Sequence, residues 1–168
     1  MNKFLLCAAT TLLLQTVNAL ADNIPTVRVG GGSVGDGGPY FKANEPSVDV
    51  YGTVRDNWHL GVGVGANYFF TSWFGAGVET RFEEVDWPNQ VSASLFFRYP
   101  IEQWRLAPYL YGGGGRQFRD GTQWLGHIGG GVDYRLTSCL GVFSDIRGTF
   151  PGNSNDFALW RFGVRLRF

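Results

Sequence analysis

The sequence ends on the stretch WRFGVRLRF, residues 160–168, in which two kinds of residue alternate strictly. The odd positions carry arginine or glycine, whereas the even positions are apolar: Trp160, Phe162, Val164, Leu166 and Phe168. An alternation of period two predicts a β-strand with one polar and one apolar face. Because the alternation continues to the last residue, we expect the terminus to be part of the fold and not a frayed tail.

The same period recurs upstream and predicts seven more strands of about the length that crosses a membrane. They cover residues 47–55, 58–68, 73–83, 90–98, 105–116, 124–136 and 140–150. Turn-forming residues such as Asp120-Gly121 and Pro88-Asn89 separate them, and no helical period appears after the N-terminal segment. An even number of meandering strands can close on itself, so the sequence predicts an all-β, eight-stranded antiparallel up-and-down transmembrane β-barrel. Strand 105–116 is apolar on both faces, and its sidedness stays open.

Charged residues occupy only one face of the strands whose faces can be assigned. We predict that they line the lumen as a charge network: Asp49, Glu79, Arg81, Arg98, Asp133, Arg135, Asp145, Arg147, Arg161 and Arg165, together with Arg55, Glu83 and Arg167. A soluble barrel with an apolar interior also alternates. The lipid-facing interpretation is favoured because a cation at mid-bilayer costs about 2–4 kcal/mol, which requires an uncharged outer face. Aromatic residues at the strand ends, which suit membrane interfaces, agree with it: Trp58, Tyr68, Trp73, Phe82, Tyr99, Trp124, Tyr134, Phe150 and Trp160.

Three segments divide the chain. Residues 1–21 have a cationic start, an apolar run too short to span a bilayer and a small-x-small ending, which predicts a secretory signal peptide. Residues 22–46 are predicted to be a Gly-rich N-terminal extension, and residues 47–168 the barrel. After cleavage Cys139 would be the sole cysteine, so no internal disulfide is expected.

Composition and motifs speak against several functions. The 14 basic and 14 acidic residues give a net charge of zero without a basic run, so no nucleic-acid partner is expected. The glycines at 61–66 imitate a dinucleotide fingerprint and residues 31–35 a nucleophile elbow, but both motifs need a strand-to-helix context that the pattern lacks. His59 and His127 are the only histidines, too few to indicate a metal or acid–base site. We predict no catalytic residues, no metal and no cofactor.

The segments APYLYGGGG, GHIGGGVDYRLT, GVFSDIRGTFP and the terminal WRFGVRLRF resemble the bacterial outer-membrane β-barrel domain family, the small OmpA/OmpX-like eight-stranded barrels. The resemblance covers roughly residues 47–168. It implies that Trp160, Phe162, Val164, Leu166 and Phe168 form the signal read by the barrel-assembly machinery. It departs from the family at Asp56-Asn57, which leaves almost no loop in the first hairpin.

We therefore expect a monomeric barrel in the bacterial outer membrane, surrounded by lipid, with both termini in the periplasm. Eight strands enclose an interior just wide enough for side chains to fill, so the lumen charges are expected to pair and plug it. Because the last strand must meet the first to close the barrel, Asp49 comes within range of the last strand, and we expect at least one of Arg161 and Arg165 to have a carboxylate partner among Asp49, Asp133 and Asp145. Its expected role is structural or interactive within the envelope. The alternatives are a small-solute channel and a lipid-modifying enzyme.

Overall fold

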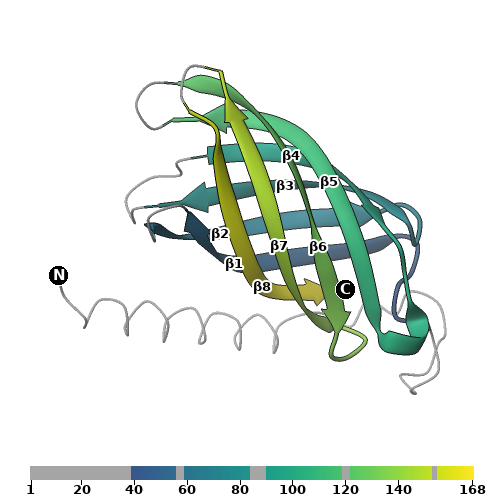
Figure 1. Ribbon diagram of the computed structural model, residues 1–168. Helices are drawn as coiled ribbons and strands as arrows, with labels where there is room; N and C mark the ends of the chain where they lie inside the picture. The colour runs from purple at the N-terminus through teal and green to yellow at the C-terminus, as the bar shows by residue number, and fades with distance from the viewer. Residues whose placement is uncertain (1–38, 56–58, 84–89, 119–121, 153–154) are drawn as a thin grey trace. The chain divides into compact units, whose positions relative to one another are not determined.

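Eight antiparallel strands form a closed barrel (Figure 1), which confirms the predicted fold class. The structure is a computed structural model that describes residues 39–55, 59–83, 90–118, 122–152 and 155–168. The strands are β1 (Glu45–Arg55), β2 (His59–Phe69), β3 (Phe74–Phe82), β4 (Gln90–Arg98), β5 (Leu106–Gln117), β6 (Gln123–Arg135), β7 (Leu140–Pro151) and β8 (Phe157–Arg167). Each strand pairs with its sequence neighbours, and β8 returns to pair with β1. No helix in this described part is long and apolar enough to cross a membrane.

The N-terminal boundary differs slightly from the sequence prediction. β1 begins at Glu45, two residues before the expected barrel start at 47. Residues 39–44, which the composition assigned to the extension, contact the barrel, as described below. The predicted signal peptide and most of the extension lie outside the described residues, as do Trp58 and the Asp56-Asn57 turn.

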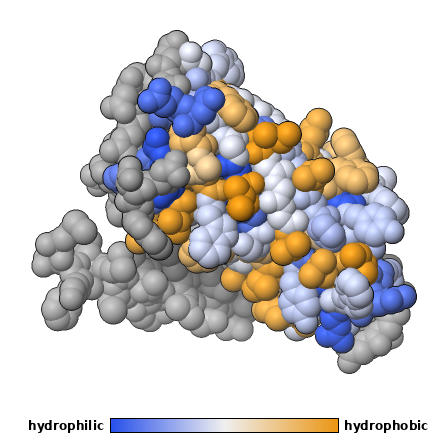
Figure 2. All heavy atoms as spheres, in the orientation of Figure 1, coloured by the Kyte–Doolittle hydropathy of each residue, from blue (hydrophilic) through white to orange (hydrophobic). Residues whose placement is uncertain are grey.

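The two faces of the strands have opposite character. Outward positions are apolar; Val64 and Ile128, for example, are 41% and 61% exposed. Arg116, at one end of β5, is the one charged residue at an outward position in these eight strands, and its guanidinium lies 4.9 Å from the centre of the Trp124 ring. Figure 2 shows apolar side chains spread over the outer surface on the side it presents. The lipid-facing assignment made from the alternation is thus the outward face of the barrel.

The barrel has two distinct ends. We call base the end that holds Glu45 and Arg167, with the connections 70–73, 99–105 and 136–139, and mouth the opposite end. The base turns are tied by threonines: Thr71 Oγ1 accepts a hydrogen bond from the Phe74 amide at 2.9 Å, and Thr137 Oγ1 one from the Leu140 amide at 3.0 Å. The remaining base connection, residues 99–105, contains the short 3₁₀ helix η2 (Glu102–Trp104).

Glycines make room for large side chains in the narrow interior. A Cβ on Gly63 of β2 would lie 2.5 Å from the hydroxyl oxygen of Tyr51, and one on Gly129 of β6 would lie 2.5 Å from that of Tyr111. Both distances are far below van der Waals contact. The glycine-rich strands, unusual in a soluble domain, therefore follow from the need to fit tyrosine rings inside eight strands.

Candidate functional site

The seam that closes the barrel carries an ion pair. Arg165 of β8 donates from Nε and Nη2 to the two carboxylate oxygens of Asp49 on β1, both at 2.7 Å. Its Nη1 donates to Asp133 of β6 at 2.8 Å, and Asn67 donates to Asp49 at 2.8 Å. All four side chains are buried. A bidentate arginine–carboxylate pair of this geometry is among the strongest neutralising arrangements for a buried charge.

A second arginine on β8 forms a similar centre nearer the mouth. Arg161 donates to Asp145 from Nε at 2.7 Å and from Nη2 at 2.9 Å, and to Glu79 from Nη1 at 2.5 Å. The hydroxyls of Tyr109 and Tyr111 donate to the same Asp145 at 2.5 and 2.8 Å. The sequence predicted a carboxylate partner for Arg161 or Arg165 among Asp49, Asp133 and Asp145; both arginines have one.

A third cluster closes the base. Glu45 accepts from Arg135 at 2.7 Å and from Arg98 at 3.0 Å, and Arg167 lies 3.4 Å away. Phe41, which is only 2% exposed, lies between the first two arginines, with its ring centre 4.3 Å from the guanidinium of Arg135 and 5.2 Å from that of Arg98. The aromatic ring thus covers the charged cluster from the base side, where residues 39–44 cross the barrel.

An aromatic layer packs among these polar centres. Its buried members contact one another across the lumen: Tyr51, Phe69, Phe96, Tyr109, Tyr111 and Phe143. Phe96 and Tyr111 stack with ring centres 5.3 Å apart. The guanidinium of Arg165 lies 5.0 Å from the Phe143 ring, so the layer also packs against the ion pairs. Aromatic and ionic groups together fill the section of the lumen that contains them.

The remaining predicted lumen residues lie toward the mouth. Arg147 forms an ion pair with Glu79, whose other oxygen binds Arg161, and Ser92 donates to Glu79 at 2.9 Å. Arg81 lies 3.0 Å from Glu83. The structure thus places all ten residues of the predicted network inside the barrel, distributed over the three clusters and this mouth group.

His127 has a hydroxyl neighbour that the sequence did not indicate. Ser94 Oγ lies 2.8 Å from His127 Nε2, and both side chains are buried in the lumen. The other ring nitrogen, Nδ1, has no hydrogen-bond partner among the described residues, so no third group orients the imidazole. Within the same residues, no group of three or more histidine, cysteine or acidic side chains is placed to hold a metal.

The residues of the predicted assembly signal lie on the outside. Trp160, Phe162 and Val164 are exposed on the outward face of β8, Leu166 occupies the same register, and Phe168, directly after the strand, is also exposed. The Phe168 amide donates to the Pro46 carbonyl oxygen at 3.2 Å, so the last residue is held against the start of β1.

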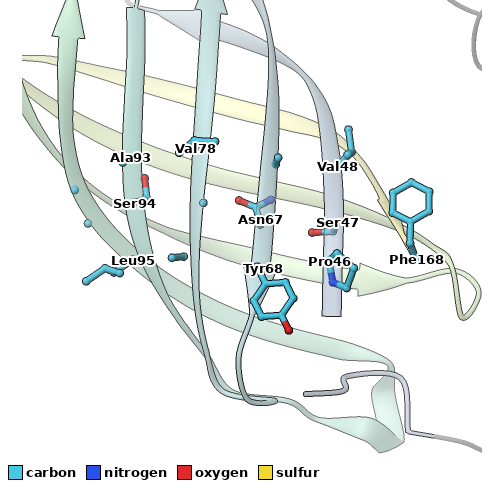
Figure 3. A pocket seen from close by; sticks show the side chains of 15 residues that line it. Pro46, Ser47, Val48, Asn67, Tyr68, Val78, Ala93, Ser94, Leu95 and Phe168 are labelled. Carbon is cyan, nitrogen blue, oxygen red and sulfur yellow. The ribbon is translucent and has the colours of Figure 1, made fainter. Parts of the chain in front are cut away.

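The outer wall is hollowed over β1 to β5. Figure 3 shows this depression, of about 660 Å³, with Leu95 on one side and Phe168 on the other. Its floor consists of small residues, Ala66, Ala76 and Ala93 among them. Since the lining is almost wholly apolar, the hollow belongs to the lipid-facing surface and not to the charged lumen.

Sequence analysis missed three features of the interior. The sidedness of β5 stayed open because both its faces are apolar, yet Tyr109 and Tyr111 point inward, where their hydroxyls meet Asp145. Glu45 and Phe41 were assigned to a linker because glycine dominates the preceding residues. The available signal for Glu45 was its position, since it is an isolated acidic residue just before the alternating residues 47–55. Nothing in the sequence distinguishes Phe41 from a linker residue.

Comparisons with known proteins agree with this architecture. The N-terminal β-barrel domain of Pseudomonas aeruginosa OprF superimposes with a TM-score of 0.65 at 17% identity, covering 75% of this chain and 98% of that domain. A de novo designed transmembrane β-barrel gives 0.60 at 18% identity, covering 76% and 98%. Neisserial surface protein A gives 0.53 at 15% identity, covering 74% and 95%. No family model and no curated protein matches the sequence. At such identities the likeness concerns the fold, which is that of the small outer-membrane-type barrels.

Proposed function

We propose that this chain is an integral protein of the bacterial outer membrane whose lumen is plugged by paired charges and which has a structural or interaction role in the envelope. The outward face, uncharged apart from Arg116 at one end of β5, supports insertion into lipid, since it avoids the cost of burying cations in the middle of the bilayer. The proposal includes both termini in the periplasm, a monomeric state, and delivery by the barrel-assembly machinery through the terminal strand.

The observation that best supports a plugged lumen is the arrangement of side chains around Arg161 and Arg165. Each guanidinium bridges two carboxylates on different strands, and the aromatic layer packs against both. A continuous water path through this section requires breaking buried ion pairs, and leaving one partner unpaired costs on the order of 3–5 kcal/mol. The packing therefore favours a closed lumen over a small-solute channel.

A lipid-modifying enzyme is less well supported. The serine–histidine pair faces the lumen, whereas a lipid substrate meets the outer wall, and the imidazole lacks an orienting partner in the described chain. We expect no catalytic activity from this barrel.

Planar-bilayer recording of the refolded full chain tests the plug. We expect no steady conductance above the lipid baseline, with a general porin as the positive control for insertion and detection. The Asp145→Ala variant removes a carboxylate from the Arg161 centre and is expected to lose stability while remaining non-conducting, because the aromatic layer persists. Regular conductance steps from the wild-type protein would contradict the plugged lumen and favour a small-solute channel.

A further inference from the structure

We propose that the mouth half of the lumen binds a small monovalent anion, of the size of chloride, between Arg81 and Arg147. This site lies apart from the ion pairs that plug the lumen, and its test does not depend on whether the barrel conducts.

The described residues that face the lumen carry more positive than negative charge. They comprise eight arginines and six carboxylates: Arg55, Arg81, Arg98, Arg135, Arg147, Arg161, Arg165 and Arg167 against Glu45, Asp49, Glu79, Glu83, Asp133 and Asp145. At the base Arg98 donates to the carbonyl oxygens of Ser72 at 2.8 Å and Lys42 at 3.1 Å, whereas Arg135 and Arg167 also have buried N–H groups without a hydrogen-bond partner among the described residues. Among the described residues that face the lumen, the mouth half has three carboxylates (Glu79, Glu83 and Asp145) for four arginines (Arg55, Arg81, Arg147 and Arg161).

Two mouth arginines are buried with unused donors. Arg147 is 0% exposed, and its Nε and Nη2 have no hydrogen-bond partner among the described residues. Arg81 is 2% exposed, and its Nε and Nη1 likewise have no hydrogen-bond partner among the described residues. Arg147 forms an ion pair with Glu79, which lies two residues before Arg81 on the same face of β3, so the two guanidinium groups belong to neighbouring positions of the lumen. Buried N–H groups normally have a partner, and buried charges an opposing charge, so a ligand that accepts hydrogen bonds and is negative fits both needs.

Neutral donors lie beside each arginine. Gln90 of β4 is the register partner of Arg81, is 1% exposed, and has no hydrogen-bond partner for its amide among the described residues. Thr149 follows Arg147 on the same face of β7, and its buried hydroxyl is likewise unused. On the mouth side Leu159 and Phe157, the register partners of Arg147 and Thr149, are buried and shield these groups with apolar surface.

The size and charge of the ligand follow from this setting. Among the described lumen residues the local excess is one positive charge, which a monovalent anion balances and a phosphate dianion would exceed. Surrounding side chains fill the eight-stranded interior, which leaves little room for an organic acid. A halide ion accepts several N–H and O–H donors without a preferred plane, and the unused donors in this half of the lumen are guanidinium, amide and hydroxyl groups. Ordered water can also accept these donors, but it leaves the local excess of positive charge in place.

Two measurements on the folded full chain in detergent test the site. In crystals soaked in sodium bromide, we expect an anomalous peak in the lumen within contact distance of Arg81 and Arg147. In solution, the melting temperature is expected to rise as chloride replaces gluconate at constant ionic strength, because gluconate is too large to enter. Absence of the bromide peak, or equal melting temperatures in the two salts, would show that water satisfies these groups and would overturn the proposal.

Matched variants locate the effect. Arg81→Gln is expected to abolish the chloride dependence, whereas Arg98→Gln, at the base, should retain it although it also removes a buried arginine. If Arg81→Gln does not fold, Thr149→Val removes one donor at nearly constant volume and is expected to weaken the dependence. Full chloride dependence in a folded Arg81→Gln or Thr149→Val variant would place the anion elsewhere and refute the assignment.

Discussion

Arg165 and Asp49 are direct register partners across the β1–β8 seam, and two hydrogen bonds of 2.7 Å join their side chains. They lie 116 positions apart in sequence, and they become neighbours because β8 pairs with β1 to close the barrel. Because Arg165 also binds Asp133, a single guanidinium connects the first, sixth and last strands.

Removing the carboxylate of this pair tests its contribution to stability. We expect Asp49→Ala to lower the free energy of unfolding by about 3–5 kcal/mol, because Arg165 then keeps a buried charge with one partner fewer. Urea unfolding in lipid vesicles, followed by tryptophan fluorescence, measures the change. Asp49→Ala combined with Arg165→Met should recover part of the loss, and a double variant as unstable as the sum of its parts would show that the pair is not coupled.

The last residue is expected to matter for assembly in cells more than for the folded state. Deleting Phe168 should leave unfolded protein in the periplasm, since it truncates the alternating terminal strand. The yield of heat-modifiable barrel in outer-membrane fractions measures this. Phe150→Ala, which changes another exposed outward phenylalanine, serves as the control. If the deletion gives the same membrane yield as the control, the terminal residue is not part of an assembly signal.

Substitutions on neighbouring positions of β2 distinguish the two faces. Val64→Arg places a cation on the outward face and should destabilise the barrel by about 2–4 kcal/mol if the position is near mid-bilayer. The milder pair Val64→Ser and Gly63→Ser should also differ, because only the second side chain meets the Tyr51 ring. Unfolding free energies in vesicles decide the matter; an identical response of the two serine variants would contradict the face assignment.

Phe41 is expected to stabilise the base. Phe41→Ala removes a buried ring from between Arg98 and Arg135, and a loss on the order of 3 kcal/mol is expected from the cavity alone. Tyr40→Ala, at the adjacent and more exposed position, should have a smaller effect. Equal unfolding free energies for the two variants would mean that residues 39–44 do not close the base.

The exposed thiol of Cys139, in a base connection, reports orientation. A large maleimide reagent excluded by the outer membrane should label it only after that membrane is permeabilised, because the base is expected to face the periplasm. As a control, Phe118→Cys in a Cys139→Ser background places the thiol near the mouth and should be labelled in intact cells. Labelling of Cys139 in intact cells would reverse the proposed orientation.

The alternation was sufficient to predict the strands and, for seven of them, the inward face, because lipid outside and charge inside impose a strict period of two. It also brought Asp49 within reach of Arg165, since closure makes the first and last strands neighbours. For β5 the rule failed for a physical reason: Tyr109 and Tyr111 are apolar enough to suit either face, and what turns them inward is Asp145 on another strand. Phe41 escaped prediction because its partners, Arg98 and Arg135, come together only after the barrel closes.

The glycines that accommodate Tyr51 and Tyr111 have a consequence for the evolution of such barrels. Gly63 cannot acquire a side chain while Tyr51 stays, and Gly129 cannot while Tyr111 stays. Gly63 and Tyr51 are therefore expected to mutate jointly, with loss of the ring preceding any gain at the glycine, whereas at Gly129 the Ile146 carbonyl oxygen, 2.7 Å from the same Cβ, is a second obstacle. In a set of orthologous sequences Gly63 and Tyr51 should covary, although 12 residues separate them.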